Sequence, residues 1–250
     1  MTKPPYLSVV IPVYNEADNF ARGNLTKISD FLARQKFSWE IIIVDDGSTD
    51  NTLALAEEMA LKSPQITVLA NPHQGKAATV AAGALAARGQ FILFSDMDQA
   101  TPIEELAKFL PKFKSGYDII IGSRSGRQGA PFFRQLLAYG MVVVRTLLLR
   151  LPYKDTQCGF KAFSQPAAHR LFKLMNQVHP PRTVRGPAVN PGFDVELLYL
   201  SRKLGLRIAE VPVKWAHRES KRVSFIKDAT AGIKELLLVR WRSLTGAYQL

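Results

Sequence analysis

The chain has a single cysteine, Cys158, among its 250 residues, so it forms no internal disulfide and fits a reducing compartment. No apolar run approaches the roughly 20 residues that a membrane-spanning helix requires. Residues 1–6 also lack the apolar core of a signal peptide. We therefore expect neither a signal peptide nor a transmembrane helix, and we expect a cytoplasmic location.

Acidic residues are scarce as well, because 33 lysines and arginines face 21 aspartates and glutamates, a net charge of +12. Such an excess favours an anionic partner: nucleic acid, acidic lipid or a phosphorylated substrate. The basic residues lack the aromatic interleaving of RNA-binding modules, and no helix-turn-helix or zinc-finger pattern is present. We therefore expect no nucleic-acid partner, and the anionic partner to be a lipid or a phosphorylated substrate.

Short apolar runs alternate with helix-like segments through the first half of the chain. This alternation predicts an α/β fold with a mostly parallel, doubly wound sheet, which we place in one domain over residues 1–225. Ligands of such sheets bind beyond the carboxyl ends of the strands, and polar loops follow the runs here. The strand-like runs are residues 7–11, 39–44, 66–69 and 91–94.

Two aspartates, Asp96 and Asp98, directly follow the last of these runs. Alternate residues of an extended chain share a face, so the two carboxylates should point the same way. Two hard oxygen donors at this place suit Mg²⁺ or Mn²⁺, which in turn bridges phosphates. Thr101, Pro102 and Glu104 predict a helix that starts with a capping box just beyond. The alternative is a solvated acidic turn, since Asp-x-Asp is a short pattern.

Polar residues after the other runs suit a nucleotide. Asp46 could accept a hydrogen bond from a base, while Tyr14 and Glu16 could contact the base plane and the ribose hydroxyls. Gly75 permits close approach of a ligand, and Lys76 would neutralise phosphate. Each could equally be an ordinary turn or cap residue. Gly75 and Lys76 do not form a P-loop, because the upstream glycine and the following serine or threonine are missing.

Three motifs share an order and a spacing across about ninety residues: Val10–Glu16, Val44–Asp50 and Ser95–Asp98. Together they resemble the inverting glycosyltransferases of family 2, which have the GT-A fold. The resemblance implies a nucleotide-sugar site and a divalent metal held at Asp96 and Asp98. The residues implied for the nucleotide sugar are Pro12, Tyr14, Glu16, Asp45, Asp46, Lys76, Asp96, Met97 and Asp98.

Three later segments narrow the resemblance: Asp155–Lys161, Gly192–Leu198 and Glu210–Arg222. They look like the branch of family 2 that contains dolichyl-phosphate glucosyltransferases and other polyprenyl-phosphate glycosyltransferases. The resemblance implies metal-dependent, inverting transfer of glucose from UDP-glucose to a polyprenyl phosphate. The alternatives are a GDP-mannose-dependent polyprenyl-phosphate mannosyltransferase and a family 2 enzyme with a soluble or polysaccharide acceptor.

In such a reaction a lipid phosphate oxygen attacks the anomeric carbon while UDP leaves from the opposite face. The catalytic candidates are Asp98, Asp194 and Arg124, with Asp194 as a base or a sugar-hydroxyl contact by its resemblance to the late acidic motif of the family. Arginine forks suit the acceptor phosphate. The candidates to bind that phosphate are Arg134, Arg145, Arg218 and Lys221.

The third metal ligand is open. A glutamine two residues beyond the second aspartate helps bind the metal in related mannosyltransferases, and Ala100 occupies that position here. We assign His217 to the metal site beside Asp96 and Asp98, with Gln99 or water as alternatives. A lone histidine is more often a core or surface residue than a ligand.

Residues 132–151 are basic and apolar together, but their apolar run is too short to span a bilayer. They predict either an interfacial helix with arginines at the lipid headgroups or a buried helix with snorkelling arginines. Residues 226–250 predict a second, basic amphipathic helix. We therefore expect a peripheral protein at the cytoplasmic face of a membrane.

Overall fold

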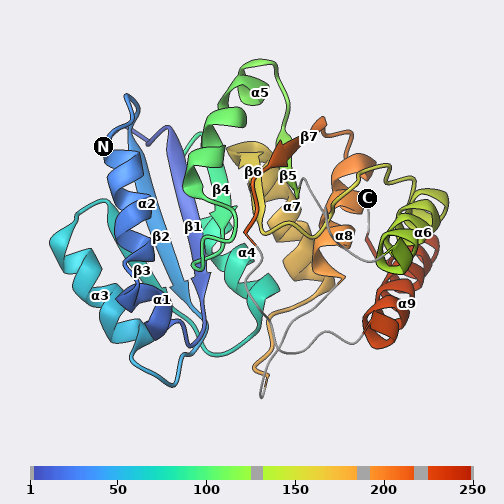
Figure 1. Ribbon diagram of the computed structural model, residues 1–250, viewed down its shortest axis with the longest axis horizontal. Helices are drawn as coiled ribbons and strands as arrows, with labels where there is room; N and C mark the ends of the chain where they lie inside the picture. Colours follow the sequence, from blue (N-terminus) through green and yellow to red (C-terminus); the bar gives the residue numbers. More distant parts are fainter. Residues whose placement is uncertain (1–2, 125–131, 185–191, 217–224, 249–250) are drawn as a thin grey trace.

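The computed structural model describes residues 3–124, 132–184, 192–216 and 225–248, without the side chains of residues 132–138, 225–229 and 231. In these residues seven strands form one sheet in the order β3-β2-β1-β4-β6-β5-β7 (Figure 1). The first four strands in this order are mutually parallel, and β5 is parallel to β7. Between these two groups β6 runs antiparallel to both β4 and β5. The strands are β1 (Leu7–Val13), β2 (Trp39–Asp45), β3 (Ile66–Ala70), β4 (Phe91–Ser95), β5 (Ile119–Arg124), β6 (Phe160–Ser164) and β7 (Ile208–Val213).

Helices cover both faces of the sheet, so its central strands are nearly continuous runs of buried apolar residues. On one face Leu25 of α2 and Phe109 pack in an apolar cluster with the sheet. On the other face Val80 of α4, Phe172 of α7 and Leu197 of α8 form a second cluster. The helices are α1 (Ala17–Ala21), α2 (Asn24–Ala33), α3 (Thr52–Lys62), α4 (Lys76–Ala86), η1 (Ile103–Lys108), α5 (Leu110–Lys114), α6 (Phe132–Leu149), α7 (Gln165–Val178), α8 (Phe193–Lys203) and α9 (Phe225–Leu244).

The predicted α/β fold with a mostly parallel, doubly wound sheet is confirmed. Strand β6 is the part that the sequence pattern does not predict. Its apolar run is interrupted by Lys161, which is nevertheless 0% exposed. A lysine is rarely buried unless it is paired, so a local pattern cannot identify this strand.

The predicted capping box at Thr101 is wrong. The segment is the 3-10 helix η1, which begins at Ile103, and its N-cap residue is Pro102, which makes no side-chain capping hydrogen bond. Instead, Oε1 of Gln99 accepts the N–H of Ile103 at 3.0 Å, and Nε2 of Gln99 donates to the carbonyl of Asp96 at 2.9 Å. The Gln99 amide therefore braces the turn between β4 and η1.

Helix α6 has features of both predicted alternatives. Arg145 is buried, whereas Tyr139 and Leu147 are 69% and 77% exposed. Helix α9 lies beside α6 at one end of the molecule and buries Leu236 in the cluster that contains α8 (Figure 1). Among the described residues no helix combines the length and the apolarity needed to cross a bilayer. The domain boundary after residue 225 stays a prediction.

Candidate active site

The carboxyl ends of β1, β2 and β4 meet at a cavity of about 290 Å³. Val13, His73 and Thr79 line it together with every residue predicted to bind the nucleotide sugar except Asp45. The structure therefore brings together side chains from three strand ends and from the start of α4. These predicted residues are Pro12, Tyr14, Glu16, Asp46, Lys76, Asp96, Met97 and Asp98.

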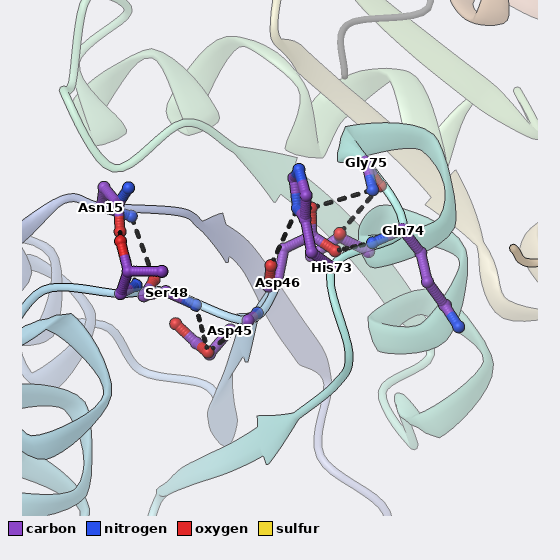
Figure 2. Close-up of polar contacts among 10 residues, drawn as sticks. Asn15, Asp45, Asp46, Ser48, His73, Gln74 and Gly75 are labelled. Atoms are coloured by element: carbon purple, nitrogen blue, oxygen red, sulfur yellow. Dashed lines mark hydrogen bonds and ion pairs between the residues drawn. The ribbon is translucent and has the colours of Figure 1, made fainter. Parts of the chain in front are cut away.

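Asp45 and Met97 belong to the supporting structure around this cavity. Asp45 is 1% exposed, and its Oδ2 accepts the N–H groups of Gly47 at 3.0 Å and Ser48 at 3.1 Å (Figure 2). Its Oδ1 accepts no hydrogen bond within the described part of the chain. Met97 is 2% exposed and packs in the apolar cluster beside α2. Asp45 therefore shapes the loop that carries Asp46.

The Asp46 carboxylate closes the loop that leads into α4. Its Oδ1 accepts the N–H of Gln74 at 2.8 Å, and its Oδ2 accepts the N–H of Gly75 at 2.9 Å (Figure 2). Nδ1 of His73 lies 2.8 Å from the same Oδ2. The His73 ring stacks on Tyr14 with centroids 4.2 Å apart and an angle of 11° between the planes. Asp46 thereby fixes a flat pair of rings in the wall of the cavity.

Lys76 is the basic group among the acidic residues of the cavity. Its Nζ lies 2.5 Å from Oδ1 of Asp96, while Oδ1 of Asp98 accepts the N–H of Ala100 at 2.9 Å. Burial lowers the pKa of Lys76, but the carboxylates of Asp96, Asp194 and Asp98 together outweigh it, so the pKa is raised. The ammonium therefore stays charged at neutral pH.

Glu16 makes the cavity more acidic still. Burial raises the pKa of Glu16 more than the hydrogen bond from Asn19 lowers it, and the charges of Asp98 and Asp96 raise it further. Four carboxylates, those of Glu16, Asp46, Asp96 and Asp98, thus share the cavity with one ammonium, that of Lys76. Such an excess of carboxylates favours a bound cation.

Asp194, the first acidic residue of α8, forms a second polar centre with the lysine of β6. Oδ1 of Asp194 lies 2.6 Å from Nζ of Lys161, which also donates to the carbonyl of Cys158 at 2.6 Å. Asp194 also exerts an electrostatic effect on both Lys76 and Arg124. The structure therefore places the predicted catalytic Asp194 beside the cavity rather than elsewhere on the sheet.

Arg124, at the end of β5, forms a two-pronged ion pair. Its Nε and Nη2 lie 2.6 and 2.9 Å from the two carboxylate oxygens of Asp155, and its guanidinium lies 5.5 Å from the ring centroid of Trp215. Glu210 accepts the N–H of Asp155 at 2.8 Å. Burial raises the pKa of Asp155, but Arg124 outweighs it and holds that pKa below its usual range. Arg124 is therefore held in one orientation.

The predicted acceptor-phosphate residues are placed only in part. Arg145 is 8% exposed and donates to the carbonyls of Leu151 and Tyr153 and to Oγ1 of Thr156, so it braces residues 150–156. This arrangement occupies the Arg145 guanidinium inside the fold. The other three acceptor-phosphate candidates stay predictions, because Arg218, Lys221 and the side chain of Arg134 lie outside the described residues. The predicted metal ligand His217 lies outside them as well.

The metal site is incomplete within the described residues, where no three His, Cys, Asp or Glu side chains form a metal-binding group. Asp96 and Asp98 supply two oxygen ligands of the kind that Mg²⁺ and Mn²⁺ prefer. The N–H of Ala216 donates to the carbonyl of Ala100 at 2.8 Å. This contact ties the segment before His217 to the turn that carries Asp98.

Sequence reasoning missed His73, Lys161 and Gly159 as site residues. His73 stands in a loop after β3 and shows its role only through Asp46 and Tyr14, which are distant in sequence. Lys161 and Gly159 lie in Asp155–Lys161, one of the segments that carry the family resemblance, but the resemblance assigns neither residue a role. Their contacts are made with residues distant in sequence, so only the fold shows them.

A mostly parallel sheet with an Asp-x-Asp turn after its central strand is the arrangement expected of the GT-A fold. The family model described as Glycosyl transferase family 2 matches residues 8–172. The chain therefore belongs to glycosyltransferase family 2 and is a glycosyltransferase.

Curated relatives narrow the family assignment. Dolichyl-phosphate beta-glucosyltransferase from Dictyostelium discoideum is 33% identical over an alignment of 264 residues, gaps included, which covers 98% of this chain and 77% of the relative. The enzyme of the same name from Homo sapiens is 35% identical over 263 residues, which cover 98% of this chain and 78% of the relative. The predicted resemblance to this branch of family 2 is confirmed.

Solved structures support the fold. Mannosyl-3-phosphoglycerate synthase from Rubrobacter xylanophilus has a TM-score of 0.67 at 17% identity, covering 98% of this chain and 76% of that one. Glucosyl-3-phosphoglycerate synthase from Mycobacterium tuberculosis, in complex with Mn²⁺, UDP-glucose and phosphoglyceric acid, has a TM-score of 0.63 at 19% identity, covering 95% and 80% of the two chains. At these identities the likeness shows the GT-A fold.

Proposed function

We propose that this enzyme transfers glucose from UDP-glucose to the phosphate of a polyprenyl lipid, with inversion and with Mg²⁺ or Mn²⁺ bound. The observation that carries the proposal is the cavity where Asp96, Asp98 and Lys76 meet the ring pair of Tyr14 and His73. The names of the relatives support glucose and the lipid phosphate, and the neighbour crystallised with Mn²⁺ and UDP-glucose supports the donor and the metal.

The nucleotide is proposed to lie along the strand ends. The stacked rings of Tyr14 and His73 offer a flat surface of the kind on which a base stacks. Lys76 at the start of α4 is suited to the diphosphate because its ammonium is charged and its side chain is 43% exposed. Pro12, Glu16 and the loop after Asp46 complete this wall.

The carboxylates of Asp96 and Asp98 are proposed to hold the divalent cation, which would stabilise negative charge on the departing diphosphate and offset the acidic excess of the cavity. We keep His217 as the third ligand, because Ala216 is hydrogen-bonded to Ala100 next to this turn.

The transfer itself forms one bond and breaks one. An oxygen of the lipid phosphate bonds to the anomeric carbon, and the bond from that carbon to the diphosphate oxygen breaks, so UDP leaves with the electron pair. A phosphate monoester is largely dianionic above its second pKa of about 6, so the nucleophile has no proton to lose. Asp194 is therefore proposed to bind a sugar hydroxyl, held there by Lys161, and Arg124 to orient the anions.

A lipid acceptor requires an approach to a membrane, and the α6–α9 pair has a suitable surface. Each helix has exposed apolar side chains about one turn apart, so each has an apolar stripe. The net charge of +12 favours an anionic lipid surface. We define this apolar surface by Tyr139, Val143 and Leu147 of α6 and by Ile233, Leu237, Trp241 and Leu244 of α9.

The test uses radiolabelled UDP-glucose with and without a polyprenyl phosphate, Mn²⁺ in the buffer and organic extraction. We expect label in the organic phase only when both substrates are present. Asp98→Ala should reduce it at least about 100-fold, since even outer-shell partners of a metal contribute 10–100-fold. Asp30→Ala, a change at an exposed aspartate of α2, should leave it unchanged.

Three other outcomes would each contradict a part of the proposal. Extractable label from GDP-mannose but not from UDP-glucose would contradict the proposed donor. Label transferred only to a water-soluble acceptor would contradict the lipid. Full activity of Asp98→Ala would remove the metal site from the mechanism.

A further inference from the structure

The segment Asp155–Lys161 lies against three charged side chains of the site: Arg124, Asp194 and Asp96. Asp155 holds Arg124 through two hydrogen bonds, and Lys161 holds Asp194 at 2.6 Å. The segment leads into β6, the antiparallel strand between β4 and β5. Its position is therefore set by the centre of the sheet.

The register of β6 brings this segment to the metal-binding turn. Ser95, the last residue of β4, pairs with Phe160, the first residue of β6, and the two strands are antiparallel. The next residue of β4 and the preceding residue of β6 are therefore neighbours: Asp96 and Gly159.

The contact between Asp96 and Gly159 leaves no room for a larger residue. A Cβ atom on Gly159 would lie 2.0 Å from Oδ2 of Asp96 and 2.8 Å from its Cγ, well inside the distance at which carbon and oxygen repel. The φ angle of Gly159 is not positive, so the backbone does not require glycine there. The opposite oxygen, Oδ1, is bound by Lys76 at 2.5 Å, so the carboxylate cannot turn away without breaking that ion pair.

We infer that the segment Asp155–Lys161 sets the positions of the acidic groups of the site, and that Gly159 is a positioning residue for the Asp96 carboxylate. Gly159 leaves the space, Lys76 holds the other oxygen, and Lys161 fixes Asp194 two residues further along β6. One short segment therefore keeps the metal-binding and sugar-binding carboxylates at a constant separation. This inference rests on the proposed role of Asp96 in binding metal and diphosphate.

The first experiment measures Mn²⁺-dependent binding of UDP by calorimetry for wild type, Gly159→Ala and Gly140→Ala. Gly140→Ala is the matched control, because a Cβ there meets no atom within 4 Å and its φ is not positive. We expect Gly159→Ala to weaken Mn²⁺-dependent binding of UDP about 10–100-fold, as changes to the outer shell of a metal site do. A high Mn²⁺ concentration should restore part of this binding. If Gly159 served only to stabilise the fold, added Mn²⁺ would not restore the binding of UDP.

The second experiment is a double-mutant cycle read by thermal unfolding. Gly159→Ala should lower Tm in the wild-type background and lower it much less in Asp96→Ala, where the opposing carboxylate is gone. If Gly159→Ala alone does not fold, the double variant should recover the fold. An equal loss of Tm in both backgrounds, or a double variant that also fails to fold, would show that the loss does not arise from a clash between residue 159 and the Asp96 carboxylate.

The outcomes separate the inference from the proposed function. Wild type that binds UDP with Mn²⁺, together with Gly159→Ala that binds equally well, overturns the positioning role alone. Wild type that shows no Mn²⁺-dependent binding of UDP overturns the proposed metal site and the positioning role with it.

Discussion

Lys161 shows how one buried charge supports the site. Its side chain is 0% exposed, and its ammonium has two oxygen partners, one from Asp194 and one from the carbonyl of Cys158. It also lies 5.7 Å from the centroid of the Phe94 ring. Removing one partner of a buried ion pair leaves the other without compensation, which costs far more than losing a surface pair.

We therefore expect Lys161→Met to destabilise the protein by about 3 kcal/mol, the low end for a broken buried pair because Asp194 stays partly solvated. Lys62→Met is the matched control, since Lys62 pairs with Glu58 where both side chains are more than half exposed. That change should cost under about 1 kcal/mol. Urea unfolding measures both, and equal effects would show that Lys161 is not a supporting charge.

One carboxylate of α8, that of Glu196, links three elements at the edge of the domain. His179 lies 2.8 Å from Oε2 of Glu196, and Tyr248 donates to Oε1 at 2.6 Å. Arg242 of α9 lies 3.2 Å from the same Oε1. The end of α7, the helix α8 and the last described turn of the chain thus meet at one buried acid.

This cluster predicts an acid-sensitive attachment. Burial raises the pKa of Glu196, but the hydrogen bonds from His179 and Tyr248, and the charge of Arg242, outweigh it and hold the pKa below its usual range. A lowered folded-state pKa means that the stabilisation is complete above the unfolded value of about 4.3 and is lost as the pH falls through the folded value.

Glu196→Gln should therefore unfold with a weaker pH dependence than wild type below about pH 5, while being less stable at pH 7. The exposed Glu57→Gln on α3 is the control and should follow the wild-type curve. Urea midpoints from pH 7 to pH 3 give the comparison. A Glu196→Gln curve parallel to wild type would show that the acid sensitivity arises elsewhere.

The whole molecule combines a basic surface with one apolar surface on α6 and α9. Most exposed large apolar side chains of the described residues lie on these two helices. Leu61 is 90% exposed and belongs to α3, a helix that lies at the opposite end of the molecule from α6 and α9 (Figure 1). Exposed apolar patches of this kind mark interaction surfaces.

Binding to lipid vesicles tests the surface. Leu237→Glu should weaken cosedimentation with vesicles containing anionic lipid about tenfold, because it places a charge where an apolar contact is proposed. Leu61→Glu makes the same change away from the surface and should leave binding near wild type. Raising the salt concentration should weaken the binding of both variants to anionic vesicles. Equal loss for both variants would contradict docking through α6 and α9.

Much of this protein follows from local sequence alone. Apolar runs bounded by turn residues predict β1 to β4 and the order of strand and helix, because a covered parallel strand must be apolar along its length. The positions of Asp46, Asp96 and Asp98 after such runs predict that they meet at one edge of the sheet. The cavity that contains them agrees with this expectation.

Only the tertiary structure decided the rest, because those contacts join residues far apart in the chain. The antiparallel insertion of β6 pairs residues about 65 to 75 positions apart, and this register alone places Gly159 against Asp96. The same holds for Lys161 with Asp194 and for His73 with Tyr14. A local pattern reports what a residue prefers beside its neighbours, whereas a buried charge or a required glycine depends on the partner that the fold brings to it.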